Sequence, residues 1–318
     1  MKISILQPQA FSEIGRRDNQ EDFLWPSPEQ VTVANRVFIL CDGMGGHDNG
    51  EVASYTAATA LGTYLTAHPA PDGVLTKPMF EAALAVAYDA LDKIDTGASK
   101  KPGTTLTCIV VHRGGVLAAH IGDSRIYHIR PSLATHTGRS GIIYQSEDHS
   151  LVNQLLRIGE ITEEEAADFP QKNVITRAMQ PHLERRHKAD IYNITDVKPG
   201  DYFFLCSDGV LEQLTNDLLG EILRRNVPDE EKLQAIRMVC EGKTRDNHSC
   251  WLVPIAEVQL EATDVPTLPD AADDAAVLTC RPSEETEVEV KLDAPAEGEG
   301  CRICAFFKHF FSRHNDGK

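Results

Sequence analysis

Two apolar runs that both end in Asp-Gly place the strongest constraint on how this chain folds. The run over residues 37–41 is followed at once by Asp42, and the run over residues 202–206 is followed, after one serine, by Asp208. A continuous apolar run of this length that stops at glycine predicts a strand covered on both faces. Hard divalent cations prefer oxygen ligands, so two carboxylates delivered at strand ends indicate a shared metal site. At either position an ordinary Asp-Gly turn is the alternative.

The glycines after Asp42 favour a close approach of the backbone to whatever this carboxylate binds. Gly43, Gly45 and Gly46 permit sharp turns that side chains would hinder. No Gly-Lys-Ser or Gly-Lys-Thr follows them, so the pattern is not that of a nucleotide-binding P-loop.

Composition excludes several classes of partner. The chain has 318 residues and a formal net charge of −17. This charge argues against nucleic acid and against an anionic membrane as partners of the folded part, and it suits a protein that holds cations. The eight cysteines lie mostly inside apolar runs, which is the usage expected of a cytoplasmic protein rather than of a disulfide framework. Residues 1–11 lack a signal-peptide pattern, and no run approaches the ~20 apolar residues of a membrane span.

Further acidic residues stand at predicted loops and strand ends. The polar segment before the first Asp-Gly run offers Glu21 and Asp22 to a metal shell. It also offers Arg17 to an anion, because a guanidinium group can donate two hydrogen bonds at once to the oxygens of a phosphate. Asp123 and Asp246 each stand at the boundary of a predicted strand. A solvated loop for the first segment, and ordinary turns for the last two residues, remain the alternatives.

Zinc ligation is not indicated. His47 and His68 have no second ligand pair at zinc spacing, and we interpret both as non-ligands. Cys301 and Cys304 form a Cys-x-x-Cys pair near the end of the chain, but no partner pair lies near them.

The rest of the first 256 residues alternates between strand and helix patterns. Apolar residues at helical spacing predict amphipathic helices over residues 51–68 and 78–94 that pack on a sheet. A Gly-Gly pair between two β-branched runs predicts a hairpin over residues 103–121. Capping patterns within residues 150–181 predict two short helices in an insertion that lines or covers the site. Strands are also expected at residues 2–7, 126–130, 191–196, 201–207 and 250–255, and helices at 216–225 and 229–240.

The character of the chain changes after residue 256. Residues 257–300 hold 13 acidic residues against Arg281 and Lys291, a net charge of 2 − 13 = −11, and this composition predicts a disordered linker. Residues 301–318 are basic and aromatic, with the apolar side chains on one side of a helix. Such a segment is typical of docking on a membrane surface or in a groove of a protein partner, and docking on the preceding domain is the alternative.

Seven motifs in one order make residues 1–256 resemble a known family, the metal-dependent protein phosphatases of the protein phosphatase 2C type, in particular the bacterial serine/threonine phosphatases. The motifs are Arg17-x-Asn-Gln-Glu-Asp22, Asp42-Gly-Met-Gly-Gly-His47, Gly103-Thr-Thr, Gly122-Asp-Ser-Arg125, Asp148-His-Ser150, Ser207-Asp-Gly209 and Asp246-Asn. The resemblance implies an α+β fold in which two antiparallel β-sheets pack as a central sandwich with helices on both outer faces.

The resemblance also implies a metal centre with Mn²⁺ or Mg²⁺ as the cofactor. By similarity, Asp42 bridges two ions, the Gly43 carbonyl binds one of them, and Asp208 and Asp246 bind the other. Glu21 or Asp22 supports the first ion largely through water, and Asp123 resembles the ligand of a third, weaker ion. Arg17 corresponds to the arginine that binds the substrate phosphate, so Arg17, Asp42 and Asp208 are the expected catalytic residues.

The implied activity is hydrolysis of phosphoserine and phosphothreonine in proteins by a metal-activated water, without a phosphoenzyme. The implied partners are phosphorylated proteins, with a partner serine/threonine kinase expected from the family. Met44 stands where many relatives have histidine, which leaves a metal-bound water as the expected proton donor and His47 as a weaker candidate. Glu212 and Phe169 also depart from the family pattern, in the support of the third ion and in the insertion.

Two other functions remain open from the sequence. The chain could be an inactive phosphoprotein-binding scaffold of the same fold, because fold alone does not fix function. It could also be a calcium-binding surface that depends on the acidic segment after residue 256.

Overall fold

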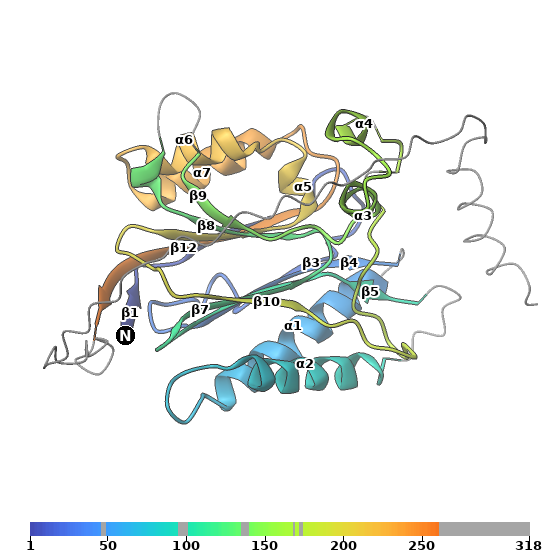
Figure 1. Ribbon diagram of the computed structural model, residues 1–318, viewed down its shortest axis with the longest axis horizontal. Coiled ribbons are helices and arrows are strands. Elements are labelled where there is room, and N and C mark those ends of the chain that lie inside the picture. The colour runs from blue at the N-terminus through green and yellow to red at the C-terminus, as the bar shows by residue number, and fades with distance from the viewer. Residues whose placement is uncertain (46–48, 95–100, 135–139, 168, 172–173, 261–318) are drawn as a thin grey trace, which may run out of the picture. The chain divides into compact units, whose positions relative to one another are not determined.

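Two antiparallel sheets lie face to face, and helices cover both outer faces of the pair (Figure 1). The computed structural model describes residues 1–45, 49–94, 101–134, 140–167, 169–171 and 174–260. All of them belong to the first of two units, Met1–Pro266 and Thr267–Lys318. This arrangement confirms the α+β sandwich expected from the sequence.

The first sheet has the strand order β1–β12–β11–β8–β9, and β2 also pairs with β12. Every pairing in it is antiparallel. Its strands are β1 (Lys2–Ile5), β2 (Gln9–Glu13), β8 (Arg125–Ile129), β9 (Ile142–Gln145), β11 (Tyr202–Cys206) and β12 (His248–Gln259).

The second sheet has the order β10–β7–β6–β4–β3, and β5 also pairs with β4. Its pairings are antiparallel as well. Its strands are β3 (Asp22–Trp25), β4 (Val37–Met44), β5 (Gly103–Thr104), β6 (Leu106–His112), β7 (Gly115–Ile121) and β10 (Asp190–Ile194).

The helices fall into three groups. The long pair α1 (Asn49–Ala67) and α2 (Lys77–Leu91) packs on the second sheet. The group α5 (Asp208–Leu211), α6 (Asn216–Arg224) and α7 (Asp229–Cys240) covers the first sheet. Between β9 and β10 lie α3 (Leu151–Arg157) and α4 (Glu163–Ala167), and one turn of 3₁₀ helix, Pro131–Leu133, follows β8.

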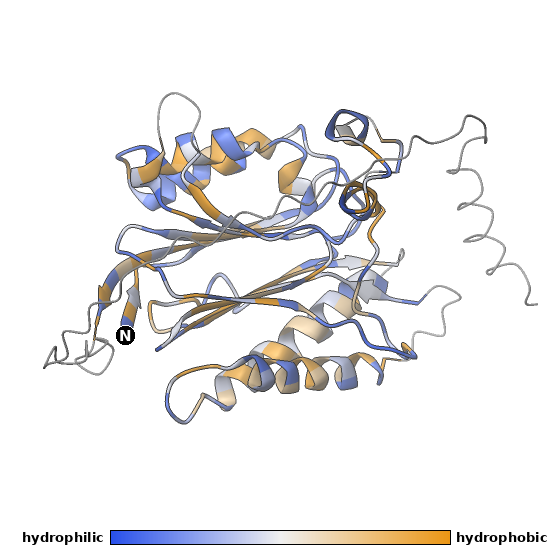
Figure 2. Cartoon of the chain, in the orientation of Figure 1, coloured by the Kyte–Doolittle hydropathy of each residue, from blue (hydrophilic) through white to orange (hydrophobic). Residues whose placement is uncertain are grey.

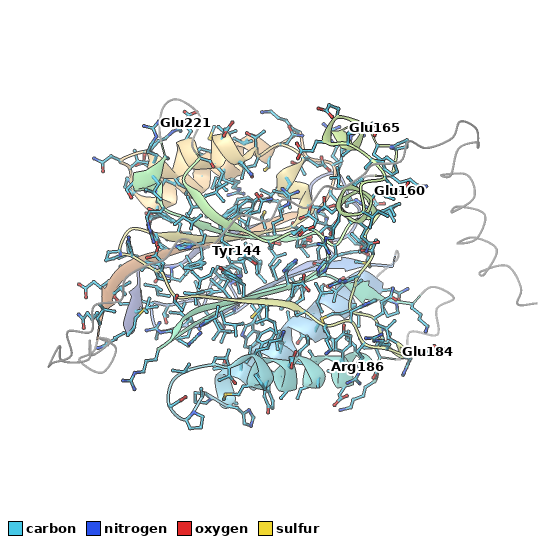
Figure 3. All side chains as sticks on the ribbon, in the orientation of Figure 1. Tyr144, Glu160, Glu165, Glu184, Arg186 and Glu221 are labelled. Carbon is cyan, nitrogen blue, oxygen red and sulfur yellow. The ribbon has the colours of Figure 1, made fainter. Side chains whose placement is uncertain are left out.

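Strand alternation explains why the sandwich has three apolar layers. In β4, Ile39 and Cys41 face α1 and α2, whereas Phe38 and Leu40 face the other sheet. This follows from the period of two along a strand, and it accounts for the continuous apolar run in the sequence. Side chains fill the space between the sheets, where Tyr144 of β9 stacks on Tyr192 of β10 with ring centroids 5.0 Å apart (Figure 3).

The outer helices differ in polarity. Blue, hydrophilic residues are prominent on α6 and α7, whereas α1 and α2 are mostly pale or orange (Figure 2). The sequence of α1 explains this difference, because Glu51 is the only charged residue in its 19 positions.

The two helices of the predicted insertion begin with the caps that the sequence predicts. Asn153 N–H donates to the Ser150 hydroxyl over 3.2 Å at the start of α3. The N–H of Thr162 donates to Glu165 Oε2 over 2.9 Å, and the N–H of Glu165 donates to the Thr162 hydroxyl over 3.3 Å, which is a capping box at α4. Both caps predicted from the sequence are confirmed.

Several elements differ from the expected ones at their ends. Short strands β2, β3 and β9 and the four-residue helix α5 were not expected. The last strand is longer than expected: it continues to Gln259, which pairs with Lys2, and so runs past residue 256, where the linker was predicted to begin. The predicted segment 301–318 and most of the predicted linker lie outside the described residues.

Candidate metal centre

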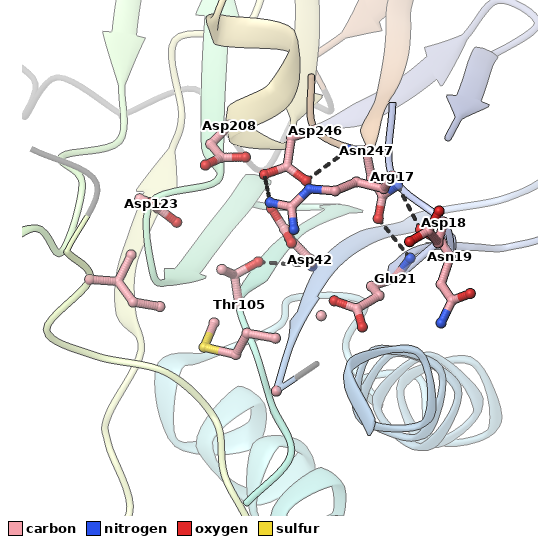
Figure 4. Close-up of a pocket in the computed structure, with 14 residues that line it drawn as sticks. Arg17, Asp18, Asn19, Glu21, Asp42, Thr105, Asp123, Asp208, Asp246 and Asn247 are labelled. Atoms are coloured by element: carbon pink, nitrogen blue, oxygen red, sulfur yellow. Dashed lines mark hydrogen bonds and ion pairs between the residues drawn. The ribbon is translucent and has the colours of Figure 1, made fainter. Parts of the chain in front are cut away.

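The residues predicted for the site come from both sheets and meet at one end of the sandwich. Asp42 lies near the end of β4, and Asp208 opens α5 directly after β11. Asp123 lies in the turn between β7 and β8, and Asp246 lies two residues before β12. Together with the β2–β3 connection they surround a cavity of about 710 Å³ (Figure 4). Its lining residues are Arg17, Asp18, Asn19, Glu21, Asp42, Gly43, Met44, Gly45, Thr105, Asp123, Ile175, Asp208, Asp246 and Asn247.

The carboxylates in this cavity repel one another. Asp42 and Asp208 lie within hydrogen-bonding reach of each other. Burial, followed by the charges of neighbouring aspartates, raises the pKa of Asp42 well above its ordinary value. Burial and the nearby Asp246 raise the pKa of Asp208 to about 6, and burial and Asp208 raise the pKa of Asp123 to about 7. Such shifts mean that a proton or a cation is needed to balance the cluster.

Asp208 adds a second sign of an incomplete coordination shell. Its Oδ1 atom is buried and has no hydrogen-bond partner among the described residues. A buried carboxylate oxygen without a donor is costly, and a hard cation removes that cost. The donor set therefore fits Mn²⁺ or Mg²⁺, because all of its members are oxygens.

The backbone around Gly43 leaves no room for a side chain. A Cβ atom at Gly43 would lie 2.2 Å from the Gly50 carbonyl oxygen and 2.7 Å from the Glu21 carbonyl oxygen. Gly43 N–H donates to that Glu21 oxygen over 3.0 Å. The first turn of α1, at Gly50, thus packs directly on the strand end that carries Asp42, and glycine is required at both contact points.

Arg17 lies at the rim of the cavity. Its Nη2 atom is 2.5 Å from Asp246 Oδ2, and its side chain is 57% exposed. The hydrogen bond to Asp246 is the main cause that raises the pKa of Arg17. An exposed guanidinium beside the carboxylate cluster is placed to meet an anion that enters from solvent.

Asp22 is the one predicted ligand that does not line the cavity. It lies opposite Asp42 in the pairing of β3 with β4 and is buried. Its Oδ2 atom accepts a hydrogen bond from the Ser207 hydroxyl over 2.8 Å, and burial raises its pKa to about 7. Of Glu21 and Asp22, only Glu21 lines the cavity, and Asp22 lies beside Asp42 on the neighbouring strand.

Asn247 and Thr105 are among the cavity residues that were not singled out from the sequence. Asn247 accepts a hydrogen bond from Glu21 N–H over 2.8 Å and donates to the carbonyls of Ile14 and Asn19, both over 2.9 Å. It therefore fixes the loop that carries Arg17. Thr105 accepts from Asp42 N–H over 3.0 Å. Both belong to motifs quoted above, Asp246-Asn and Gly103-Thr-Thr, and that membership was the available signal.

The remaining sequence candidates lie elsewhere. His47 lies outside the described residues, and His68 at the end of α1 stacks on Tyr64 with ring centroids 4.2 Å apart. Glu212 accepts from Arg245 N–H over 3.0 Å and is not among the residues that line the cavity. Ile175 of the insertion does line the cavity, as expected for a segment that borders the site.

Comparisons with known proteins agree with this geometry. The chain is 31% identical over 267 residues to "Protein phosphatase PhpP" of Streptococcus pneumoniae, which covers 82% of this chain and 100% of that protein. The structure of the serine/threonine phosphatase PstP/Ppp of Mycobacterium tuberculosis aligns with a TM-score of 0.64 and 28% identity, over 80% of this chain and all of that one. A PstP catalytic domain in complex with two manganese ions aligns with a TM-score of 0.62 and 27% identity over the same shares. A sequence profile described as "Protein phosphatase 2C" matches residues 14–239, so the chain belongs to the protein phosphatase 2C family.

Proposed function

We propose that this protein is a metal-dependent serine/threonine phosphatase that hydrolyses phosphoserine and phosphothreonine in other proteins. The observation that carries the proposal is the convergence of Asp42 from one sheet with Asp208 and Asp246 from the other in a single cavity. Family membership supports it, since the relatives compared above are named as protein phosphatases.

The lining of the cavity supports a specific assignment of metal ligands. Asp42 interacts electrostatically with Asp208, Asp123 and Asp246, and its carboxylate would be shared by two Mn²⁺ or Mg²⁺ ions. The Gly43 carbonyl and Glu21 would hold the ion next to α1, and Asp208 and Asp246 would hold the other ion. Asp123, which lines the same cavity, would hold a third ion. When bound, such ions lower the pKa of water and offset charge on phosphoryl oxygens.

Three other residues of the cavity bear on how the substrate is bound and cleaved. Arg17 donates hydrogen bonds to the phosphate oxygens, and it gives up its contact with Asp246 to do so. Asn247 holds the Arg17 loop in place through its three hydrogen bonds. Met44 lines the same cavity, and its thioether has no proton to donate to a leaving group.

The experiment compares aspartate variants on a phosphothreonine peptide at saturating Mn²⁺. Asp42→Ala and Asp208→Ala should lose hydrolysis while their far-ultraviolet circular dichroism stays that of the unchanged protein. Asp217→Ala, at an exposed position in the first turn of α6, is the matched control and should keep full activity. Full activity of Asp42→Ala would refute the assignment.

The alternative of an inactive phosphoprotein-binding scaffold is not favoured, because the relatives compared above are named as protein phosphatases. Hydrolysis of a chromogenic aryl phosphate with and without Mn²⁺ distinguishes the two functions. Deletion of residues 261–318 addresses the calcium-surface alternative, which predicts that all dependence on cations disappears with that segment.

We further propose that the protein acts in cytoplasmic signalling opposite a serine/threonine kinase, with residues 301–318 as a docking segment for a membrane surface or a protein partner. The arguments are the cysteine usage, the family and the basic aromatic composition of that segment. Within the described residues, no helix is both long and apolar enough to cross a membrane. Unchanged localisation and substrate preference after removal of residues 301–318 would contradict the docking role.

A further inference from the structure

His149 forms a reciprocal pair of hydrogen bonds with Gly122, the residue before Asp123. Gly122 N–H donates to His149 Nδ1 over 3.1 Å, and His149 N–H donates to the Gly122 carbonyl over 2.9 Å. His149 is 7% exposed, so both bonds are shielded from water. His149 comes from the segment after β9, and therefore these two bonds join that segment to the β7–β8 turn.

The turn that His149 holds has little freedom of its own. Gly122 has a φ of +108°, and a Cβ atom there would lie 2.6 Å from the Thr105 Cγ2 atom. The Thr105 hydroxyl in turn lies 2.8 Å from the Ser124 hydroxyl. Asp123 lies between Gly122 and Ser124 in the chain, and its carboxylate lines the cavity (Figure 4).

The far side of the His149 ring faces a carboxylate outside the cavity. His149 Nε2 lies 3.2 Å from Asp190 Oδ2, at the start of β10. Arg177 Nη1 lies 3.1 Å from the other oxygen of Asp190 and 3.3 Å from the same Nε2. The His120 ring stacks on His149 with centroids 4.6 Å apart.

These contacts fix the tautomer of His149. Burial and the neighbouring His120 lower the pKa of His149 to about 4, so the ring is neutral at neutral pH. Nδ1 accepts from Gly122 N–H, hence the single ring proton lies on Nε2 and is donated to Asp190. His120, His149 and Asp190 have ligand atoms within 4.8 Å of one another, but a protonated Nε2 offers no lone pair to a metal ion. The trio is therefore a structural support in which His149 pairs with Asp190 and stacks on His120.

We propose that His149 is a positioning residue: through its bond to Gly122 N–H it holds the Asp123 carboxylate in the orientation that binds the third ion. The inference rests on the proposed function for the identity of that ion. A single buried hydrogen bond contributes about 0.5–1.5 kcal/mol, which corresponds to a change of roughly two- to tenfold in ion affinity.

Substitution of His149 by asparagine or by glutamine tests the roles of its two ring nitrogens separately. In His149→Asn the side-chain oxygen takes the place of Nδ1 and can still accept from Gly122 N–H, whereas in His149→Gln the amide lies near Nε2 and reaches Asp190 instead. Asp190→Asn is the matched control that alters the Nε2 side alone. Mn²⁺ binding to the full chain is measured by electron paramagnetic resonance of free Mn²⁺, with Asp123→Ala identifying the weak class of site.

His149→Gln should weaken the Asp123-dependent site two- to tenfold, whereas His149→Asn and Asp190→Asn should stay within twofold of the unchanged protein. In the Asp123→Ala background, His149→Gln should have no further effect on Mn²⁺ binding. Equal affinity of His149→Gln and the unchanged protein, or no Asp123-dependent site at all, would overturn the inference.

Two further measurements separate loss of the hydrogen bond between His149 and Gly122 from loss of the fold. Thermal unfolding of each variant with EDTA shows whether the fold is retained, and exchange of the Gly122 amide hydrogen should be faster in His149→Gln than in His149→Asn. Equal exchange in the two variants contradicts the proposed bond even where a variant is unstable. If Mn²⁺ binding behaves as expected and phosphopeptide hydrolysis is absent, the proposed function fails and the positioning role stands.

Discussion

At the scale of single residues, Asp42 shows that a residue expected to serve catalysis can lower the stability of the metal-free fold. Its carboxylate is buried among like charges, which raises its pKa and destabilises the charged form. A residue in this position is retained for what it binds, since a neutral side chain would fold more easily there.

Asp42→Asn should therefore make the metal-free protein more stable, by about 1–3 kcal/mol, while phosphatase activity is lost. The measurement is urea unfolding in EDTA at neutral pH, alongside an activity assay with Mn²⁺. In saturating Mn²⁺ the order should reverse, because only the unchanged protein gains from binding the ion. A less stable Asp42→Asn protein in EDTA would show that repulsion within the cluster is unimportant.

Asp201 is the opposite case, a carboxylate that the fold satisfies completely. It is fully buried and accepts from His128 Nε2 over 2.8 Å, from Arg130 over 2.8 and 2.9 Å, and from Lys198 N–H over 2.8 Å. Burial raises its pKa, but the hydrogen bonds from His128, Arg130 and the backbone outweigh burial, and the net pKa is lowered.

Asp201→Asn should cost about 3–5 kcal/mol of folding free energy at neutral pH, since it leaves the buried Arg130 and His128 without their charged partner. A lowered pKa means that this contribution is present above the pKa of the unfolded chain and is lost as pH falls through the folded value. The difference in unfolding free energy between the two proteins should thus be constant from pH 7 to about pH 5 and shrink below about pH 4. A difference that is undiminished at pH 2 would contradict the role of the charge.

At the scale of elements, α1 supports the metal site by packing on the strand end that carries Asp42. Its first turn packs on Gly43, and further along Gly62 lies against Trp25 of β3. A Cβ atom at Gly62 would be 2.2 Å from Trp25 Nε1. This close approach lets the helix sit on the sheet at the depth that the Gly43 contact requires.

Gly62→Ala should destabilise the protein by about 1–3 kcal/mol, although alanine favours helix formation over glycine. Thr63→Ala, at the next and exposed position, is the control and should be neutral or stabilising by up to about 0.7 kcal/mol. Thermal unfolding of both variants gives the comparison. If Gly62→Ala proves as stable as Thr63→Ala, the packing of α1 on Trp25 is looser than described.

The elements also show what could and could not be predicted from the sequence. Strands β4 and β11 were predicted because both of their faces are buried, which gives continuous apolar runs. Strands β2 and β9 are short, partly exposed and mixed in composition, so no period stands out. The chain places Glu21 and Asp22 side by side, and only the start of β3 at Asp22 decides which of them faces the cavity.

At the scale of the whole molecule, the last described strand extends the sheet past residue 256. Lys2, Ile3 and Ser4 of β1 pair with Gln259, Val258 and Glu257 of β12. These pairings extend beyond residue 256, because the edge strand β1 needs a partner along its full length.

A chain of residues 1–260 should therefore unfold at the same temperature as the full chain, whereas residues 1–256 should be less stable by about 1–3 kcal/mol. Differential scanning calorimetry of the three proteins provides the measurement. Equal stability of the two shortened chains would mean that the end of β12 contributes nothing to the fold.

The pairing of β1 with β12 brings the first residue of the sheet next to the last one, Lys2 beside Gln259. The chain thus enters and leaves the sandwich at one edge. A domain built in this way can be spliced into a surface loop of another protein without separating the two ends of that loop, which makes residues 1–260 a suitable insert for an engineered phosphatase fusion.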